Sequence, residues 1–470
     1  MKKYISIIAL AIAVLLTGSA SASARNEVSF DKYFQDATLR LDYVFCGDAH
    51  HQAIYLERMY KTSAWAGRRN NLEKPLLAGN GQVNVSDPST GQVIYSNSFS
   101  TLFQEWQSYE EATKVQKAFE NCIQVPFPKA PVRVEVTLTD VHGKVTSSIS
   151  HVVDPSDILI CRLNDNSLER RVLKSSTAAN PIDVVFVADA YDASEKEKFF
   201  ADATRGVEAL FSHEPYAAYA DRFSVVAVFQ PSQQSGVSQP GLGVWHNTAA
   251  DSHFDTFYMD RYLTTSSMRK LYDIIGTVPF EHIILMVNTP VYGGGGIYNS
   301  ITIMGSDHYT FRNVLVHEFG HAFGGLGDEY AYGDLEEPMY PSDTEPWEPN
   351  ITTLKDFASK WQDLLPANCP IPTPVDEIET KADVRRIWDT LSKEQKESLN
   401  LKVGVYEGAG YSLTGVYRPV QECRMRINEC EEFCPVCTRA IIKMIKYYSE
   451  EFVLTQKKSG WPLVNRSNSQ

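Results

Sequence analysis

The stretch from Val314 to Tyr330 constrains this chain more than any other part of its 470 residues, because it contains His317-Glu318-x-x-His321. A helix completes a turn in about 3.6 residues, so side chains four residues apart project from the same face. Two imidazoles on one face can bind a single ion, and zinc is the ion that this pattern typically holds. Glu318 projects slightly to one side, where its carboxylate can accept a proton from metal-bound water. The stretch therefore predicts a helix that carries a zinc site.

Three glycines, Gly324, Gly325 and Gly327, follow the predicted helix directly. Glycine is a poor helix former and permits positive φ, so we expect the helix to end there and the chain to fold back. Asp328, seven residues after His321, could then supply a third ligand. The alternative is a core helix whose histidines are hydrogen-bonded and whose acidic pair is solvated.

The motif and its continuation resemble a known group of peptidases. His-Glu-x-x-His-x-x-Gly is similar to the metzincin zinc peptidases, in which the glycine at the place of Gly324 lets the chain turn towards its third ligand. Metzincins usually have that ligand, a histidine, where this chain has Gly327. The continuation Gly-Gly-Leu-Gly-Asp-Glu-Tyr resembles the IgA-peptidase family of zinc metalloendopeptidases. Further similar segments, within about 180–450, are Val184–Tyr191, Pro231–Gly236, Tyr417–Pro419 and Cys423–Met425.

The resemblance implies an α/β (α+β) metzincin-like catalytic domain with a twisted mixed sheet, preceded by an all-β sandwich-like companion domain. It also implies an acidic third zinc ligand. Asp328 is our prediction, and Glu329 is the alternative because the acidic pair is shifted by one residue relative to the metzincin histidine. Met425 would form an apolar support beneath the ligands, as a methionine turn does in metzincins, and Tyr417 would be a further donor to the oxyanion.

The pattern of apolar residues changes at the polar stretch 174–181. Short alternating strands precede it, as in a sandwich, whereas apolar strands alternating with helices follow it and indicate a sheet flanked by helices. Ser194 and Glu197 have the spacing of a capping box for a helix that runs to about Phe211. The predicted strands are 39–45, 92–95, 132–138, 144–153, 182–188, 223–229 and 282–287.

A run of four glycines within 292–304 lies just ahead of the predicted zinc helix. The resemblance implies an edge strand here that pairs with the substrate backbone, and glycines would allow a close approach. The alternative is a flexible hairpin.

The first residues are typical of a signal peptide: Lys2 and Lys3, an apolar run at 5–16, and small residues up to Ala24. The apolar run is too short for a comfortable membrane span, and no later segment is long and apolar enough for one. We therefore predict export to the periplasm or secretion. The predicted parts are a signal peptide at 1–24, the N-terminal β-sandwich-like domain at 25–175, the zinc metallopeptidase catalytic domain at 180–455 and a C-terminal tail at 456–470.

Charge and cysteine content add two expectations. The net charge of −14, with no concentrated basic patch, makes nucleic acid an unsuitable partner. Acidic residues crowd the loop after the motif, which is either a solvated excursion, a specificity loop or a structural Ca²⁺ site. These acidic residues are Asp334, Glu336, Glu337, Asp343, Glu345 and Glu348.

The eight cysteines of an exported chain favour disulfides. The last four fall within fifteen residues and could instead form a structural zinc site, although their first spacing is long for a zinc ribbon. We therefore predict disulfides. The cysteines are Cys46, Cys122, Cys161, Cys369, Cys423, Cys430, Cys434 and Cys437.

These features predict an exported zinc metalloendopeptidase that acts on a protein or glycoprotein substrate. One zinc ion would be held by His317, His321 and Asp328, with Glu318 as general base. The chain has no Gly-x-Ser-x-Gly elbow of a serine hydrolase. The alternative is a secreted binding or adhesion protein with a structural or vestigial metal site. Immunoglobulin A as the substrate does not follow from the resemblance, because loops that form pockets diverge readily.

Overall fold

The computed structural model describes residues 28–163, 168–331, 339–375 and 384–450. The predicted signal peptide, the predicted tail and the acidic residues Asp334, Glu336 and Glu337 lie outside these ranges. Within them, no helix combines the length and the apolar character that a membrane span requires.

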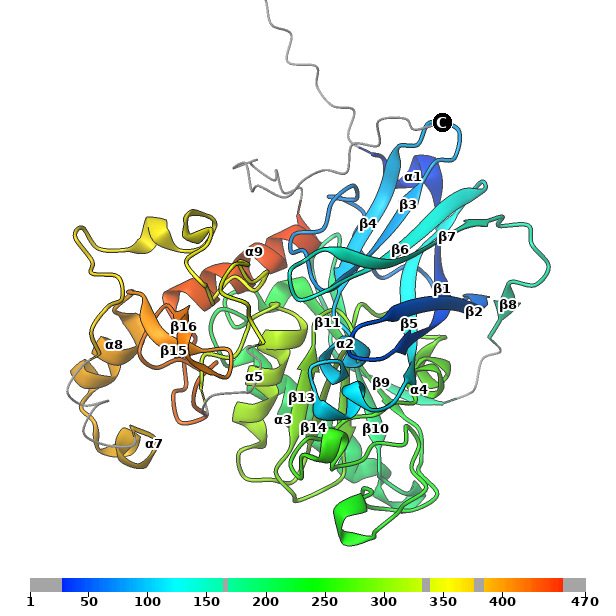
Figure 1. The fold of residues 1–470 in the computed structure, drawn as a ribbon. Helices are drawn as coiled ribbons and strands as arrows, with labels where there is room; N and C mark the ends of the chain where they lie inside the picture. The colour runs from blue at the N-terminus through cyan, green and yellow to red at the C-terminus, as the bar shows by residue number, and fades with distance from the viewer. Residues whose placement is uncertain (1–27, 164–167, 332–338, 376–383, 451–470) are drawn as a thin grey trace, which may run out of the picture.

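The N-terminal region is rich in β structure, as predicted. Two four-stranded sheets, ordered β5-β1-β2-β8 and β4-β3-β6-β7, share one core (Figure 1). Strand β6 shows why they pack: its residues alternate between buried and more exposed, and Val134 and Val136 join Leu39 and Leu41 of β1 in the core. The strands are β1 (Phe34–Gly47), β2 (Gln52–Lys61), β3 (Gly81–Ser86), β4 (Val93–Phe99), β5 (Lys117–Pro128), β6 (Val132–Thr139), β7 (Val145–Val153) and β8 (Cys161–Arg162). Short helices α1 (Phe30–Tyr33) and α2 (Leu102–Trp106) accompany them.

The second region is a mixed α/β structure built on a six-stranded sheet of order β13-β14-β12-β10-β11-β9. The four central strands are parallel to one another, and each of the two edge strands pairs antiparallel with the strand beside it. Strand β9 falls within the range predicted for the N-terminal domain, yet it pairs with β11 of this sheet. The strands are β9 (Glu169–Lys174), β10 (Ile182–Asp189), β11 (Phe223–Phe229), β12 (His282–Val287), β13 (Gly294–Ile297) and β14 (Ile301–Gly305).

Helices cover both faces of this sheet. Alternate residues of β10 point to opposite sides: Val184 and Phe186 join one core, and Val185 and Val187 join another. The first core also contains residues of α3 (Lys196–Phe211), α5 (Phe311–Ala322) and the C-terminal helix α9 (Pro435–Ser449), and the second contains residues of α4 (Met268–Ile275). Between α5 and α9 the chain forms α7 (Val384–Ile387), α8 (Lys393–Leu401) and the hairpin of β15 (Tyr406–Ala409) and β16 (Ser412–Arg418).

The capping box before α3 lies two residues earlier than predicted. The Asp192 side chain accepts a hydrogen bond from the Ser194 N–H, and Glu195 accepts one from the Asp192 N–H at 3.0 Å. The prediction of Ser194 and Glu197 was wrong because a single 3₁₀ turn (Ala193–Glu195) precedes the α-helix, so the chain begins to coil at Asp192.

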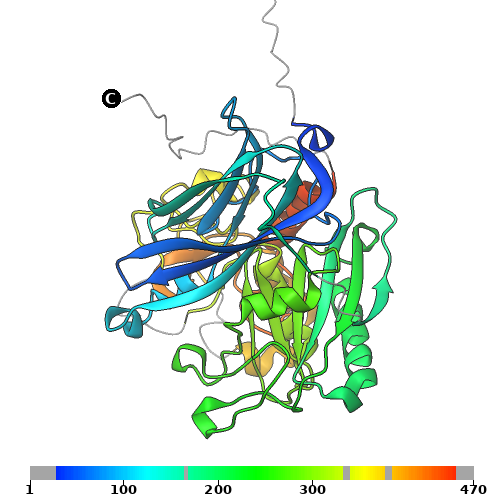
Figure 2. The same cartoon turned by 90° about the vertical axis from the view of Figure 1, so that its right-hand side faces the viewer.

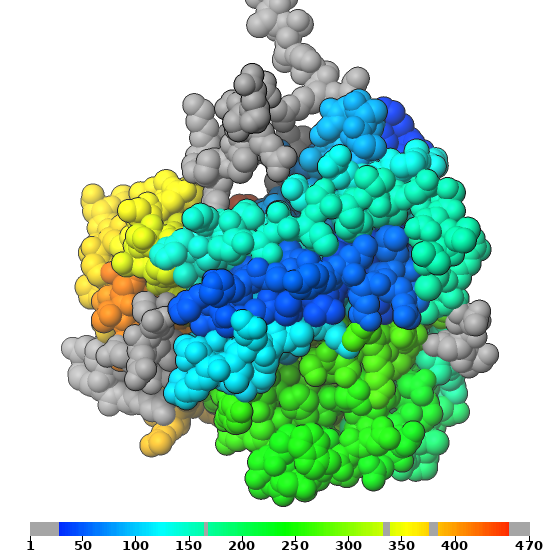
Figure 3. All heavy atoms as spheres, turned by 45° about the vertical axis from the view of Figure 1, so that its right-hand side comes forward, coloured from blue at the N-terminus to red at the C-terminus, as the bar shows by residue number. Residues whose placement is uncertain are grey.

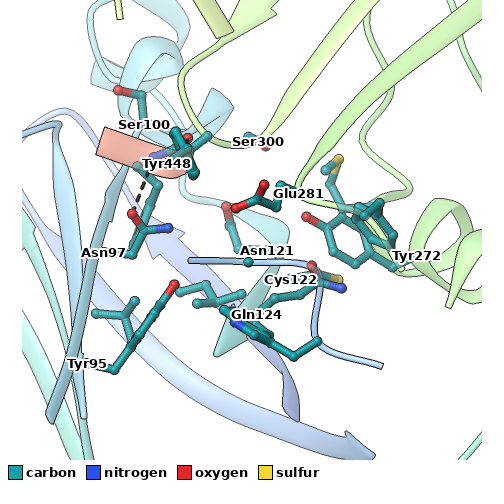
Figure 4. A pocket seen from close by; sticks show the side chains of 18 residues that line it. Tyr95, Asn97, Ser100, Asn121, Cys122, Gln124, Tyr272, Glu281, Ser300 and Tyr448 are labelled. Carbon is teal, nitrogen blue, oxygen red and sulfur yellow. Dashed lines mark hydrogen bonds between the residues drawn. The ribbon is translucent and has the colours of Figure 1, made fainter. Parts of the chain in front are cut away.

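The two regions lie directly against each other (Figures 2 and 3). Arg40 of β1, fully buried, pairs with Asp273 of α4 at 2.6 Å. A cavity of about 70 Å³ also lies between them, lined by residues such as Tyr95 and Asn121 on one side and Glu281 on the other (Figure 4). Its lining contains none of the predicted site residues.

Candidate active site

Helix α5 carries His317, Glu318 and His321, and it ends at Ala322, where the glycines predicted an end. Its apolar residues fix it to the core beneath the sheet. After the helix, Gly325 takes φ +62° and its N–H donates to the carbonyl of His321 at 3.0 Å. This left-handed residue reverses the chain and returns it along the helix.

The reversed chain brings Asp328 to the two histidines. Asp328 Oδ1 lies 3.2 Å from His317 Nε2 and 3.1 Å from His321 Nε2. The two Nε2 atoms are 3.0 Å apart. Three ligand atoms thus face a common point, and all three side chains are buried or nearly so.

Each histidine ring is oriented by a backbone carbonyl. His317 Nδ1 bonds to the carbonyl of Arg424 at 2.9 Å, and His321 Nδ1 bonds to that of Leu326 at 2.6 Å. A carbonyl only accepts hydrogen bonds, so each Nδ1 carries the proton and each Nε2 can offer a lone pair. The rings are therefore oriented as metal ligands require.

The donor set fits zinc. Bonds of about 2.0–2.1 Å from a tetrahedral zinc to nitrogen or oxygen place neighbouring ligand atoms about 3.3 Å apart. The three separations here are 3.0, 3.1 and 3.2 Å. Two imidazoles and one carboxylate also match the ligand types of a catalytic zinc, which keeps a fourth position for water.

The electrostatics of this cluster favour a cation. Burial by itself would raise the pKa of the Asp328 carboxyl, but His321 and His317 hold that pKa well below its usual range. Burial would lower the pKa of His321, but the Asp328 carboxylate raises it to about 9. In the absence of metal a proton on histidine balances the carboxylate, so metal binding must release that proton.

Glu318 lies beside these residues on the same helix, where it faces strand β13. A Cβ added at Gly294 would lie 3.2 Å from Glu318 Oε1. Burial raises the pKa of the Glu318 carboxyl, whereas the electrostatic interactions with His317 and His321 act in the opposite direction. A carboxyl with a raised pKa is a better proton acceptor at neutral pH.

The glycines of β13 allow this strand to pack closely against α5. A Cβ at Gly296 would lie 2.2 Å from the carbonyl oxygen of Glu318 and 2.9 Å from the His321 Cβ. The glycines therefore allow β13 to approach α5 closely, whereas the sequence led us to expect a close approach to substrate. β13 is an edge strand, as expected, and Gly294 also forms a parallel bridge to Tyr262. Pairing of this edge with substrate remains a prediction.

Met425 is fully buried next to α5. Its Sδ would lie 2.9 Å from a Cβ at Gly320, and its carbonyl accepts a hydrogen bond from the Glu329 N–H at 2.9 Å. The methionine thus packs under the helix turn between the two histidines, where support was expected.

Tyr417 lies on β16, and its role as a donor to the oxyanion remains a prediction. It faces Glu407 across the β15–β16 hairpin, and burial together with the Glu407 carboxylate raises the pKa of its hydroxyl. Among the described residues it makes no hydrogen bond to the three ligand side chains. Tyr411, at the turn of the same hairpin, donates to Asp328 Oδ2 at 2.5 Å. Sequence reasoning missed Tyr411, although the neighbouring Gly410 marks the turn.

The N-terminal region adds one acidic side chain that sequence reasoning also missed. Glu105 of α2 accepts a hydrogen bond from Tyr262 at 2.6 Å. Burial raises its pKa to about 7, and the charges of Asp328 and Glu318 contribute to that shift. Glu105 is thus electrostatically coupled to the group of His317, His321 and Asp328, which we call the histidine cluster. No motif in the sequence signals Glu105.

Glu329 points away from the histidines. It is fully buried, and its Oε1 accepts hydrogen bonds from Asn350 Nδ2 at 2.9 Å and from Cys437 Sγ at 3.0 Å. The geometry therefore favours Asp328 over Glu329 as the third ligand.

The described acidic residues of the following loop have their own partners. Glu345 accepts hydrogen bonds from Thr353 and Asp356, Tyr340 donates to Glu348, and His142 contacts Asp343. None of these three acids belongs to a metal-binding group in the described part of the chain. A calcium site in this loop remains a prediction.

All eight cysteines lie in the described ranges, and all are free. The predicted disulfides are therefore absent from the structure. Cys423 Sγ and Cys437 Sγ are 3.9 Å apart, about twice the length of an S–S bond of ~2.05 Å.

Comparison with protein families decides the relationship. The model of the IgA peptidase M64 family matches residues 171–445, and that of the peptidase M64 N-terminus matches 29–150. The chain belongs to the IgA peptidase M64 family. The resemblance inferred from the motifs is thereby confirmed, and the M64 family implies a metallopeptidase that acts on protein. The N-terminal match covers strands β1 to β6 and part of β7, and the M64 peptidase match extends from β9 into α9. Among curated proteins the comparison finds no match.

Proposed function

We propose that this M64-family chain is an exported, zinc-dependent endopeptidase with a metzincin-like catalytic domain. The observation that carries the proposal is the convergence of His317 Nε2, His321 Nε2 and Asp328 Oδ1, within 3.2 Å of one another, beside Glu318. A zinc-binding helix followed by a glycine turn and then a ligand, with a buried methionine beneath, supports the metzincin-like assignment. The N-terminal leader supports export.

In this proposal His317, His321 and Asp328 hold the zinc ion. When bound, zinc lowers the pKa of water to about 7 and polarises the carbonyl of the scissile peptide bond. Residues of the chain do the rest. Backbone carbonyls orient both imidazoles, and the Tyr411 hydroxyl, 2.5 Å from Asp328 Oδ2, restrains the carboxylate.

Glu318 is the residue that moves protons. Its carboxylate accepts a proton from the attacking water and then donates it to the leaving amine. Burial raises the pKa of the Glu318 carboxyl in the metal-free chain, which favours acceptance of the proton. Gly294 and Gly296 have no side chains, so β13 can lie close to α5 beside Glu318.

Cleavage of a complex peptide library by the purified mature protein tests the activity. We expect internal cuts with zinc, none after treatment with a strong chelator, and recovery when zinc is restored. Intact zinc-loaded protein that cuts no peptide would favour a binding protein instead. N-terminal sequencing of the mature protein tests export, with processing after Ala22 or Ala24 as the expected result.

A further inference from the structure

A second group of potential metal ligands lies behind the histidine cluster. It consists of Glu329, Cys423, Cys434 and Cys437, and we call it the cysteine cluster. One ligand atom from each of the four side chains lies within 4.8 Å of all the others. All four residues are fully buried, at 0% exposure.

The separations suit a metal better than a covalent bond between sulfurs. Zinc–sulfur bonds of about 2.3 Å place two sulfur ligands of a tetrahedral ion about 3.8 Å apart. Cys423 Sγ and Cys437 Sγ are 3.9 Å apart. Glu329 Oε1 lies 3.0 Å from Cys437 Sγ, and its Oε2 has no hydrogen-bond partner among the described residues. A buried carboxylate with an unpartnered oxygen is costly unless a cation or donor reaches it.

The backbone around the sulfurs stabilises thiolates. The Cys434 N–H donates to Cys423 Sγ at 3.3 Å, and the Cys437 N–H donates to Cys434 Sγ at 3.5 Å. Cys434 is the N-cap of α9, a helix of 15 residues whose positive end faces the cluster. The Cys-x-x-Cys spacing of 434 and 437 is also one that zinc sites use repeatedly.

The burial of the cluster excludes exchange with other thiols as its function. A Cys-x-x-Cys pair at a helix N-terminus also occurs in redox proteins, but there an attacking thiolate must reach the sulfur. Cys434 and Cys437 are both at 0% exposure, so no partner protein can reach them in this fold. Three sulfurs and a carboxylate that form a closed set of four match a structural metal site.

We propose that Glu329, Cys423, Cys434 and Cys437 bind a structural zinc ion, distinct from the one held by the histidines. The cysteine cluster shares its chain segments with the histidine cluster. Glu329 follows Asp328 directly, and the Glu329 N–H donates to the backbone carbonyl of Met425 at 2.9 Å. Cys423 precedes Arg424, whose carbonyl orients His317 at 2.9 Å. An ion here ties both segments together and thereby supports the ligands of the histidine cluster.

Metal analysis of the full mature chain, prepared under reducing conditions and supplied with zinc, tests the proposal. We expect two zinc ions per chain in the wild type, one in His317→Ala and one in Cys434→Ser. Cys430→Ser is the matched control and should retain two. Cys430 is equally buried and lies in the same segment, but it stands outside the cluster and its sulfur accepts from Asn400 at 3.5 Å.

A second measurement on the wild type serves if Cys434→Ser does not fold. Cobalt(II) bound at the cysteine cluster should give thiolate-to-cobalt charge-transfer absorption, and this absorption should persist in His317→Ala. The histidine cluster contains no sulfur ligand and cannot produce the band.

Each outcome separates this proposal from the proposed peptidase activity. One zinc in the wild type and none in His317→Ala would overturn the cysteine site and leave the catalytic one. One zinc in both would support the cysteine site and remove the catalytic one. Iron in place of zinc, no thiolate band with cobalt, or a disulfide between two cluster cysteines in the metal-loaded protein would overturn the proposal.

Discussion

The histidine cluster and the cysteine cluster are separated by a single peptide bond, between Asp328 and Glu329, yet they differ in every property that matters for a metal. The first offers two nitrogens and one oxygen, and His321 and Glu318 beside it keep some solvent exposure. The second offers three sulfurs and one oxygen, all fully buried. Three ligands leave room for water, whereas four close the coordination sphere.

The comparison explains why two adjacent acids can have unlike functions. Asp328 contacts the two histidines and Glu329 contacts Cys437, although both follow the same glycine turn. The chemistry of each acid is set by the group it faces. Substitutions that act on one cluster and spare the other are the sharpest tests of this division.

The largest expected effect is that of replacing Glu318, the proposed general base beside the histidine cluster. Glu318→Gln should lower peptidase turnover by about 10²–10⁴-fold, because an amide cannot accept the proton. Its zinc content should equal that of the wild type, since Glu318 is not a ligand. Steady-state kinetics and metal analysis on the same sample check both. Glu208→Gln, an exposed change on α3, is the control, and near-normal turnover in Glu318→Gln would remove this residue from the mechanism.

The next effect distinguishes the adjacent acids. Asp328→Ala should weaken zinc binding at the histidine cluster by more than about 100-fold, beyond the ~10–100-fold typical of losing a group that only orients a ligand. Glu329→Ala should weaken it by no more than that smaller range. Titration against a competing chelator, followed in a Cys434→Ser background, isolates this cluster. The reverse order of affinities would make Glu329 the third ligand.

A smaller effect concerns the pH dependence of the unfolding free energy, to which Glu105 contributes. Glu105 is electrostatically coupled to the histidine cluster. Its pKa is about 7 in the folded chain because of burial, against about 4.3 when unfolded. Between about pH 4.3 and 7, Glu105 is therefore protonated in the native state and ionised in the unfolded state. This stabilisation is fully present below about pH 4.3 and is lost as pH rises through 7.

We expect Glu105→Gln, in metal-free protein, to flatten the decline in unfolding free energy between pH 5 and 8 by about 2–3 kcal/mol. Denaturant titrations across that range measure it. An unchanged slope would mean that Glu105 titrates normally in the folded chain.

The smallest effect separates two tyrosines of one hairpin. Tyr411→Phe removes the hydrogen bond to Asp328 Oδ2 and should weaken zinc binding by about 10-fold. Tyr417→Phe should leave zinc affinity unchanged, because its hydroxyl lies beside Glu407. Chelator competition measures both affinities. A loss of turnover in Tyr417→Phe alone, with zinc retained, would support the role as a donor to the oxyanion that the sequence predicted for it.

The sequence predicted the elements whose signals are local. The strands at 223–229 and 282–287 and helix α5 have the predicted extents or nearly so, since each combines a continuous apolar pattern with a clear end signal. The histidine spacing required one helix face, and the glycines required a reversal.

Features that depend on distant segments were beyond that reasoning. Glu105 and Tyr411 reach the site only because the N-terminal region and a late hairpin fold against α5, and nothing near them in sequence indicates it. The disulfide prediction considered only the number of cysteines and the expected compartment. It could not show that Glu329 would join three of them in one buried group.

Asn350 fixes the end of the loop that follows the motif to the start of that loop at Gly327. Its side chain accepts from the Gly327 N–H at 2.7 Å and donates to the Gly327 carbonyl at 2.9 Å, so it pairs with that residue much as a neighbouring strand would. The chain is therefore fastened to itself across 23 residues, immediately before Asp328. Insertions or deletions between these two anchors need not move the ligand. Changes in the length of this loop should therefore leave Asp328 beside His317 and His321.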